Sequence, residues 1–329
     1  MNTTLDVTSP RATATAIGVD LGGTKTAAGL VRPGGDVELG CTAPTPAADG
    51  PEAIIDTVVG LISQIRAKAL DSGLPTPTAI GIGAAGVINP ATGTVVSATD
   101  HLTGWAGTPL ADLVAARTGL PVRAINDVHA HAIGEARYGA GRGLGSLLVI
   151  AAGTGLGGSL VLDGNPVTGA RHVAGHLGHI PAPEADGLPC PCGRTGHLEA
   201  VASGPGLLAF FPRRGGHAPD TRHVITQAKA GDRVALDCVT LAAGALGRAI
   251  GGWVNMLDPD AVILTGGLAQ SGPLWWTTVT GAAHQQYIDA VADCPLLPPQ
   301  RGTDAAILGA AALTQQPAAT GTTPTGETP

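Results

Sequence analysis

Two hydrophobic patterns alternate along the chain, and together they predict an α/β fold. Short apolar or β-branched runs predict buried strands at residues 16–20, 27–31, 78–83, 121–126, 145–152, 159–162 and 261–264. Apolar residues at helical spacing predict helices at residues 51–72, 110–118, 128–137 and 233–257. The first of these helices has Pro51 near its start and Gly73 just after its end, which is typical of helix boundaries.

Three glycine-rich turns follow predicted strands: Gly22-Gly23-Thr24, Gly153-Thr154-Gly155 and Gly266-Gly267. The order of strand, glycine turn and strand occurs in both halves of the chain, which predicts an internal duplication around a cleft. Such turns expose backbone N–H groups without an obstructing Cβ atom, so they suit a polyphosphate. A single turn of this kind more often only reverses the chain, and the first one lacks the upstream glycine of a P-loop.

Length and composition set broad limits. The 329 residues are enough for two domains, and the Thr-, Pro- and Gly-rich segments 1–14 and 316–329 are expected to be flexible tails. With 25 Asp and Glu against 18 Lys and Arg, the net charge of −7 argues against nucleic-acid or anionic-membrane partners. We find no signal peptide or membrane span, and five cysteines are too few for a disulfide scaffold. We therefore expect a cytoplasmic protein.

Two aspartates at predicted strand ends are candidates for phosphoryl-transfer chemistry. Asp20 is placed to hold Mg²⁺ directly or through water, or else it caps its own turn. Lys25 is either a phosphate ligand or a solvated surface residue. Asp127 is either the N-cap of the next helix or the base that accepts a proton from an attacking hydroxyl. In the second case Asn126 would orient a neighbouring hydroxyl.

A Pro- and Gly-rich loop carries four residues that suit a metal ion. Cys190 and Cys192 form a C-x-C pair, with His197 five residues after it and His179 eleven residues before it. Two nitrogen and two sulfur ligands are enough for a tetrahedral structural Zn²⁺. The loop has few apolar residues to hold its shape, which favours zinc over a metal-free pair of reduced thiols.

These motifs resemble the ROK family, which includes sugar kinases and transcriptional repressors. The resemblance covers residues 16–314 and rests on Asp20-x-Gly-Gly-Thr-Lys25, Asn126-Asp127, Gly153-Thr154-Gly155 and the segments AGHLGHIP and CPCGRTGHLEAVASG. It implies a two-lobed actin-like ATPase fold of the ribonuclease H-like type, with a central cleft. The implied N-terminal lobe is 15–125, completed by a helix at about 303–315. The implied C-terminal lobe is 126–302, with a zinc loop at 179–197.

The resemblance also implies residue roles, with ATP and Mg²⁺ in the cleft, Asp127 as catalytic base and a structural Zn²⁺ behind the sugar site. The implied sugar-contacting residues are Gly86, Thr99, Asn126, Asp127, His176, His179 and Glu199. The implied nucleotide-binding residues are Asp20, Gly22, Gly23, Thr24, Lys25, Gly153, Thr154, Gly155, Gly266 and Gly267, the last two beside the adenosine. His179 would bind zinc through one ring nitrogen and a sugar hydroxyl through the other.

Several histidines depart from the family pattern. His197 stands where the family usually has cysteine, and imidazole is also a competent zinc ligand. His176 stands where family glucokinases commonly have glutamate. Bacterial N-acetylmannosamine kinases instead resemble this chain in Ala-Gly-His-x-Gly-His and Cys-Gly-Arg-Thr-Gly. The remaining histidines without evident partners are expected at the surface or in loops: His101, which falls where many relatives carry a sugar-contacting Asn, and His129, His131 and His284.

We therefore expect an ATP-dependent kinase that phosphorylates a hydroxyl group of a hexose or N-acylhexosamine. The expected acceptor is the 6-hydroxyl. N-acetylmannosamine is the preferred substrate, with glucose and N-acetylglucosamine as alternatives, and polyphosphate stays open as a donor. A sugar-responsive repressor is the alternative from another class, but its DNA-binding module would precede a first strand that begins here near residue 16. The resemblance also implies a homodimer, since family members are often dimers.

Overall fold

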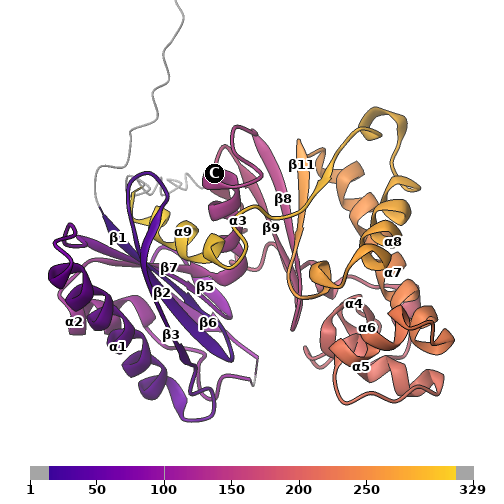
Figure 1. The fold of residues 1–329 in the computed structure, drawn as a ribbon, viewed down its shortest axis with the longest axis horizontal. Helices are drawn as coiled ribbons and strands as arrows, with labels where there is room; N and C mark the ends of the chain where they lie inside the picture. The colour runs from indigo at the N-terminus through magenta and orange to yellow at the C-terminus, as the bar shows by residue number, and fades with distance from the viewer. Residues whose placement is uncertain (1–14, 100, 316–329) are drawn as a thin grey trace, which may run out of the picture.

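The structure is a computed structural model that describes residues 15–99 and 101–315. It contains two lobes, each built around a five-stranded sheet (Figure 1). Strands and helices alternate along much of the chain, so the expected α/β class is confirmed. The expected flexible tails, 1–14 and 316–329, lie outside the described residues.

The first lobe has the strand order β3-β2-β1-β4-β7. Its main strands are β1 (Ala16–Leu21), β2 (Lys25–Val31), β3 (Val37–Pro44), β4 (Ala79–Ala84) and β7 (Val122–Asn126). A separate two-stranded ribbon consists of β5 (Val87–Asn89) and β6 (Thr94–Ser97). The helices on this lobe are α1 (Gly50–Asp71), which lies against β2 and β3, and α2 (Leu110–Thr118).

The second lobe has the strand order β10-β9-β8-β11-β12. Its strands are β8 (Ser146–Ala152), β9 (Leu156–Leu162), β10 (Asn165–Pro166), β11 (Ala261–Thr265) and β12 (Leu296–Leu297). Its helices are α4 (Glu199–Ala202), α5 (Gly204–Phe210), α6 (Thr221–Lys229), α7 (Arg233–Leu257) and α8 (Pro273–His284). Two further helices, α3 (Asp127–Tyr138) and α9 (Asp304–Leu313), pack against each other between the sheets.

The two sheets have matching topology. In the first, β1 pairs antiparallel with β2 and parallel with β4, which pairs parallel with β7. In the second, β8 pairs antiparallel with β9 and parallel with β11, which pairs parallel with β12. The repeated strand and turn pattern in the sequence is therefore matched by a repeated sheet, as expected of an internal duplication.

Glycines allow α9 to lie directly on the first sheet and on α3. A Cβ atom on Gly81 of β4 would lie 1.7 Å from the carbonyl oxygen of Ala310, and one on Gly309 would lie 1.7 Å from that of Ala130. Real Cβ atoms do not approach backbone this closely, so the helix could not pack there with larger residues. This contact places the C-terminal helix against strands of the first sheet.

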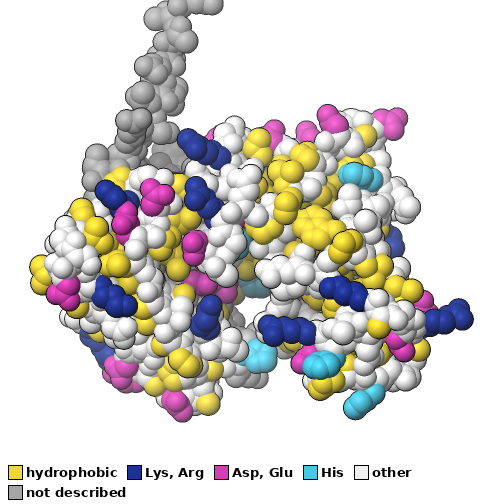
Figure 2. Space-filling model, viewed as in Figure 1, with side chains coloured by type: hydrophobic (Ala, Val, Ile, Leu, Met, Phe, Trp, Pro, Cys, Tyr) yellow, Lys and Arg dark blue, Asp and Glu magenta, His cyan; other side chains and the backbone are white. Residues whose placement is uncertain are grey.

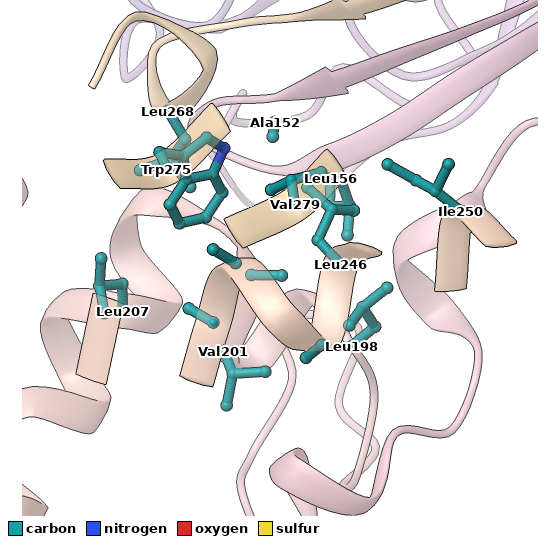
Figure 3. Packing of buried hydrophobic residues seen from close by; sticks show 14 of the residues in the cluster. Ala152, Leu156, Leu198, Val201, Leu207, Leu246, Ile250, Leu268, Trp275 and Val279 are labelled. Atoms are coloured by element: carbon teal, nitrogen blue, oxygen red, sulfur yellow. The ribbon is translucent and has the colours of Figure 1, made fainter. Parts of the chain in front are cut away.

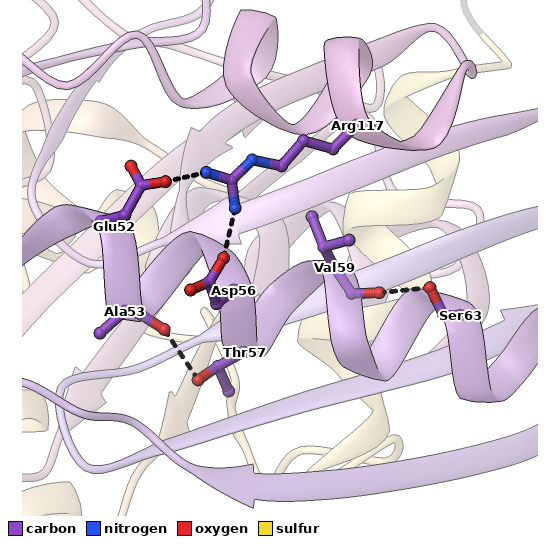
Figure 4. A network of polar contacts seen from close by, with 7 residues as sticks. All are labelled: Glu52, Ala53, Asp56, Thr57, Val59, Ser63 and Arg117. Atoms are coloured by element: carbon purple, nitrogen blue, oxygen red, sulfur yellow. Dashed lines mark hydrogen bonds and ion pairs between the residues drawn. The ribbon is translucent and has the colours of Figure 1, made fainter.

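Each lobe has its own hydrophobic core, and both cores are poor in aromatic residues. Figure 3 shows part of the second core, where Trp275, Leu246 and Leu207 are fully buried among smaller side chains. In the first lobe, Arg117 of α2 pairs with Glu52 and Asp56 of α1 at the surface (Figure 4). The apolar residues inside each lobe therefore supply most of the burial that holds its helices on its sheet.

Among the described helices, only α7 is long and apolar enough to pass a length-and-hydropathy test for a membrane span. Its most apolar stretch is 61 % buried inside the protein. The helix packs along α8 and contributes many residues to the second core, so its apolar character is explained by packing.

One predicted strand and one strand that was not predicted differ from expectation for physical reasons. The strand expected at 159–162 begins earlier, at Leu156, because Gly157 and Gly158 pair with β8. A Cβ atom on Gly158 would lie 2.4 Å from the side chain of Leu177, so glycine makes room for the chain that crosses the strand. Strand β3 was not predicted, because it is an edge strand whose residues are alternately half-buried and exposed and include Gly40 and Pro44.

Candidate active site

The first sheet places several expected site residues at one edge. Its parallel register pairs Asp20 with Gly83 and Ala84 with Asn126, so the carboxyl ends of β1, β4 and β7 lie together. Gly86 follows β4 with a φ of 106°, and its carbonyl oxygen accepts a hydrogen bond from Asn126 Nδ2 at 3.0 Å. In α/β proteins this edge is the usual place for ligands. The fold therefore brings together Asp20, Gly86 and Asn126.

Asn126, and not Asp127, is the N-cap of α3. Its Oδ1 accepts hydrogen bonds from the backbone N–H groups of Val128 at 3.0 Å and His129 at 3.3 Å. Its Nδ2 donates to Gly86 and, at 2.8 Å, to Oδ1 of Asp127. The alternative in which Asp127 caps the helix is therefore wrong. Both amide protons of Asn126 are used, so it orients the Asp127 carboxylate, and a direct sugar contact requires exchange of one of these bonds.

Asp127 is close enough to Asp20 for its charge to affect the protonation of Asp20. Burial raises the pKa of Asp20 to about 6, with a further upward contribution from Asp127 and an opposing one from Lys25. Burial also raises the pKa of Asp127, while hydrogen bonds from Val128 and Asn126 and the charge of His176 lower it. Two carboxylates held this way favour a bound divalent cation, which stabilises their ionised forms. The chemistry of this pair therefore fits Mg²⁺.

A cleft of about 520 Å³ opens between the lobes, and Figure 2 shows the molecule hollowed there. Asp20 and Lys25 line it from the first lobe, and Gly266 and Gly267 line it from the second. The structure thus brings four of the residues expected at the nucleotide to one cavity. The turn formed by Gly22, Gly23 and Thr24 connects Asp20 to Lys25, and the Gly22 N–H donates to the Lys25 carbonyl oxygen at 3.1 Å.

The turn between β8 and β9 lies between the Gly266–Gly267 loop and Glu199. A Cβ atom on Gly153 would lie 3.8 Å from the backbone nitrogen of Gly267, and one on Gly155 would lie 3.2 Å from Oε2 of Glu199. Glu199 is only 8 % exposed, and it accepts a hydrogen bond from the N–H of Leu156 at 2.8 Å. The turn that contains Thr154 therefore separates the expected nucleotide side from the expected sugar side.

The four candidate metal ligands gather in one cluster. The ligand atoms of His179, Cys190, Cys192 and His197 all lie within 4.8 Å of one another. Nδ1 of His179 is 3.5 Å from Sγ of Cys190, and Nδ1 of His197 is 3.3 Å from Sγ of Cys192. Tetrahedral zinc places its nitrogen and sulfur ligands about 3.5 Å apart, so the cluster fits this ion. Burial raises the pKa of Cys190 to about 11, so a cation is needed to favour its thiolate.

His176 and His179 connect the metal cluster to Asp127. Their ring centroids are 6.0 Å apart, and Nδ1 of His176 donates to the Val173 carbonyl oxygen at 2.9 Å. The charge of His176 lowers the pKa values of both Asp127 and His179. Burial lowers the pKa of His179 most, and Glu199 opposes this shift. A neutral His179 with Nδ1 toward the sulfur atoms leaves Nε2 for a ligand.

Thr99 is less closely connected to this group. It is exposed on the loop after β6. The atoms nearest to a Cβ atom added on Gly86 belong to Ser97, whose carbonyl oxygen is at 2.8 Å, and to Ala98, whose Cβ is at 3.4 Å. Among the described contacts, none joins the side chain of Thr99 to Asp127 or His176.

The sequence analysis missed or misplaced several residues near the site. His101 and His284 are exposed as expected, but surface positions are wrong for His129 and His131. His129 is 3 % exposed and pairs with Oγ of Ser159 at 2.8 Å, and His131 lines the cleft. Both follow Asp127 on α3, and the four-residue spacing of Asp127 and His131 was the available signal for a shared helix face. The cleft lining also includes Thr42, Gln270, Thr303 and Asp304.

Comparison with known proteins finds relatives along nearly the whole chain. The model of the ROK family matches residues 16–317. A glucokinase of Streptomyces coelicolor is 33 % identical over 322 residues, which covers 92 % of this chain and 98 % of the relative. An N-acetylmannosamine kinase of Escherichia coli is 34 % identical over 304 residues, with coverage of 92 % and 98 %. A solved ROK family glucokinase from Streptomyces griseus, in complex with glucose and AMPPNP, has a TM-score of 0.77 at 32 % identity, with coverage of 91 % and 98 %.

Proposed function

The chain belongs to the ROK family, and from this premise we propose that it transfers the γ-phosphoryl group of ATP to the 6-hydroxyl of an N-acylhexosamine, with N-acetylmannosamine preferred. Its relatives are glucokinases and N-acetylmannosamine kinases, and its fold is the two-lobed actin-like fold of these enzymes. The chain is therefore an ATP-dependent sugar kinase. The choice between the two sugars is the proposal, because both groups of relatives are about equally similar.

The observation that carries the choice is His176, whose charge acts on Asp127. Its Nδ1–H is engaged by the Val173 carbonyl oxygen, so Nε2 is the nitrogen available to a sugar. An imidazole presents one hydrogen-bonding atom where a glutamate presents an anionic pair of oxygens. This difference changes which ring hydroxyls and substituents are accepted, because buried polar groups that lack partners are costly.

The proposed mechanism relies mainly on positioning. Asp127, oriented by Asn126, accepts the proton of the attacking hydroxyl, and an ordinary carboxylate suffices because the phosphoryl-transfer transition state is loose. Asp20 would hold Mg²⁺, which would neutralise phosphate charge. Lys25 and the glycine turns at Gly153 and Gly266 would hold the nucleotide through charge and backbone N–H groups.

A sugar panel tests the proposed preference. Coupled assays of kcat/KM with N-acetylmannosamine, N-acetylglucosamine and glucose should rank N-acetylmannosamine first, and His176→Glu should shift the ranking toward glucose. Exposed His284→Glu is the matched control and should leave the ranking unchanged. A kcat/KM for glucose more than about tenfold above that for N-acetylmannosamine would overturn the choice.

Asp127→Asn tests the proposed base. The substitution keeps the size of the side chain and an acceptor oxygen for Val128, but it removes the proton acceptor. We expect kcat to fall by about 10²–10⁴-fold while the sugar still binds, as measured by calorimetry. Turnover close to that of the unaltered enzyme would remove Asp127 from this role.

We also propose that one structural Zn²⁺ per chain is bound by His179, Cys190, Cys192 and His197. The ion would fix the ring direction of His179, so that Nε2 can donate to a sugar hydroxyl. Metal analysis of freshly purified protein should find one zinc per chain, and Cys190→Ser with Cys192→Ser should remove it. Cys238→Ser, in the second core, is the control that should retain zinc. The expected homodimer also stays a prediction, which light scattering tests.

A further inference from the structure

His129 lies in the first turn of α3, two residues after Asp127, and the proposed mechanism gives it no role. Its Nδ1 is 2.8 Å from Oγ of Ser159 on β9, and the two residues are only 3 % and 0 % exposed. Burial lowers the pKa of the ring to about 4, so His129 is neutral at pH 7. A neutral imidazole and a hydroxyl satisfy each other in either tautomer. The pair is therefore a buried polar contact between α3 and the second sheet.

The loop that carries His176, residues 174–177, lies on the same part of β9. The N–H of Gly158 donates to the carbonyl oxygen of Gly175 at 2.7 Å. A Cβ atom on Gly175 would lie 2.0 Å from the carbonyl oxygen of Gly158, and the φ of 92° at Gly175 also favours glycine. The loop is therefore held tightly against the strand at the residue before Ser159, and His176 is the next residue after this contact.

The ring of His129 also lies against this loop. Its Cε1 is 3.4 Å from the position of a Cβ atom on Gly175, so the ring and the loop backbone are in close contact. The backbone of Ala174 raises the pKa of His129, and the charge of His176 lowers it, so both act on the ring. One buried side chain thus joins the start of α3, strand β9 and the His176 loop.

We propose that His129 is a positioning residue for sugar binding, which sets the direction of His176 relative to Asp127. Ser159 holds the ring in the orientation that this role requires. The start of α3 supplies Asp127 and the loop supplies His176, and His129 contacts both elements. Asn126 orients the carboxylate of Asp127, so His129 acts on how tightly the sugar binds more than on the transfer step. This inference rests on the proposed contact of His176 with the sugar.

Sugar kinetics of Ser159→Ala and His129→Leu test the inference, with N-acetylmannosamine, or with glucose if the sugar panel ranks it first. Both changes break the contact at 2.8 Å, so the KM for the sugar should rise about three- to tenfold. The kcat and the KM for ATP should stay within about twofold. His129→Asn keeps an amide near the position of Nδ1 and should restore the KM for the sugar to within about twofold. Ser146→Ala, which removes the hydroxyl acceptor of the Asp260 N–H at the start of β8, is the matched control and should leave this KM unchanged.

The variant His176→Ala distinguishes positioning from a general structural effect. Alone, it should raise the KM for the sugar, because the proposed contact is lost. Adding Ser159→Ala to it should change this KM by less than about twofold, because the side chain that His129 positions is already gone. A structural contribution independent of His176 would raise the KM by the same factor in both backgrounds, and this result would overturn the inference.

Two further outcomes separate this inference from the proposed function. An unchanged KM for the sugar in Ser159→Ala and His129→Leu, together with a raised one in His176→Ala, would overturn the inference and leave the proposed function intact. An unchanged KM in His176→Ala would remove the contact of His176 with the sugar, and the inference would fail with it. Ser159→Ala removes one buried oxygen atom and adds no volume, so it provides the test if His129→Leu does not fold.

Discussion

The buried position of Asp20 lowers the free energy of unfolding at neutral pH. Its folded pKa of about 6 lies above the ordinary value of 3.8, so the folded state binds the proton more tightly than the unfolded state. The free energy of unfolding therefore falls as pH rises from about 4 to 6, and the penalty is fully present above pH 6. A carboxylate kept at this cost beside a second carboxylate is typical of a functional site.

Replacement of Asp20 by asparagine should therefore separate stability from activity. At pH 7.5 we expect Asp20→Asn to raise the free energy of unfolding by about 1–3 kcal/mol, because the buried charge is removed. ATP turnover should be lost, because the proposed Mg²⁺ ligand is gone. Denaturant titration and a coupled kinase assay measure the two effects. Asp112→Asn, at an exposed position on α2, is the control and should change neither quantity. A destabilised Asp20→Asn protein would contradict the argument.

Several candidate site residues lie at the start of helix α3, and only some of their roles could be predicted from the sequence. Asn126-Asp127 was recognised from a strand end followed by a helix, and this required no tertiary information. The capping role of Asn126 could not be assigned, because both residues are good N-caps and the choice depends on where the helix begins. His129 and His131 were misplaced because their partners, Ser159 and the cleft, come from distant parts of the chain.

His129 joins α3 to the second sheet and to the loop that carries His176. Its Nδ1 pairs with Ser159 of β9 at 2.8 Å, and the backbone of Ala174 raises the pKa of its ring. Burial, with a smaller contribution from His176, lowers its pKa to about 4 from the ordinary value of 6.5. Between pH 4 and 6.5 the unfolded state therefore binds more protons at this histidine than the folded state does. The free energy of unfolding falls as pH decreases through that window.

The contributions of His129 and Asp20 to the pH dependence of stability should oppose each other. Between about pH 6 and 4, acidification favours folding through Asp20 and disfavours it through His129. Relative to the unaltered protein, Asp20→Asn should lose more stability on acidification from pH 6 to 4.5, and His129→Leu should lose less. Urea unfolding at several pH values measures both slopes, and exposed His217→Leu is the control for a histidine outside this network. The same pH dependence of the free energy of unfolding in all four proteins would refute the opposing roles of Asp20 and His129.

At the scale of the whole molecule, the two lobes and the cleft were predictable because the glycine turns recur in both halves. The return of α9 to the first lobe was implied only by the resemblance. Its close packing depends on Gly81 and Gly309, and no local pattern shows that a distant carbonyl oxygen lies against a particular glycine. The small strands β10 and β12 were also missed, because two residues each are too few for a hydrophobic period.

One fully buried carboxylate hydrogen-bonds to both of the chain segments that connect the lobes downstream of α3. These segments are 139–145, which leads from α3 into β8, and 298–303, which leads from β12 to α9. Glu135 of α3 is 0 % exposed, and its Oε2 accepts hydrogen bonds from the N–H groups of Ala140 at 3.0 Å and Gln300 at 3.1 Å. Its Oε1 accepts one from the N–H of Arg301 at 2.7 Å.

Glu135→Gln should loosen this junction, including segment 298–303, which contributes Pro299, Gly302 and Thr303 to the cleft lining. Glutamine has one acceptor oxygen in place of two, so at least one buried N–H group loses its partner, and its own amide N–H groups face other donors. We expect the free energy of unfolding to fall by about 2–4 kcal/mol and hydrogen exchange to speed up at Ala140, Gln300 and Arg301. Glu38→Gln, which removes a surface ion pair with Arg32, should cost at most about 1 kcal/mol. Unchanged exchange at all three amides would show that Glu135 does not hold the lobes together, because these amides are its direct partners.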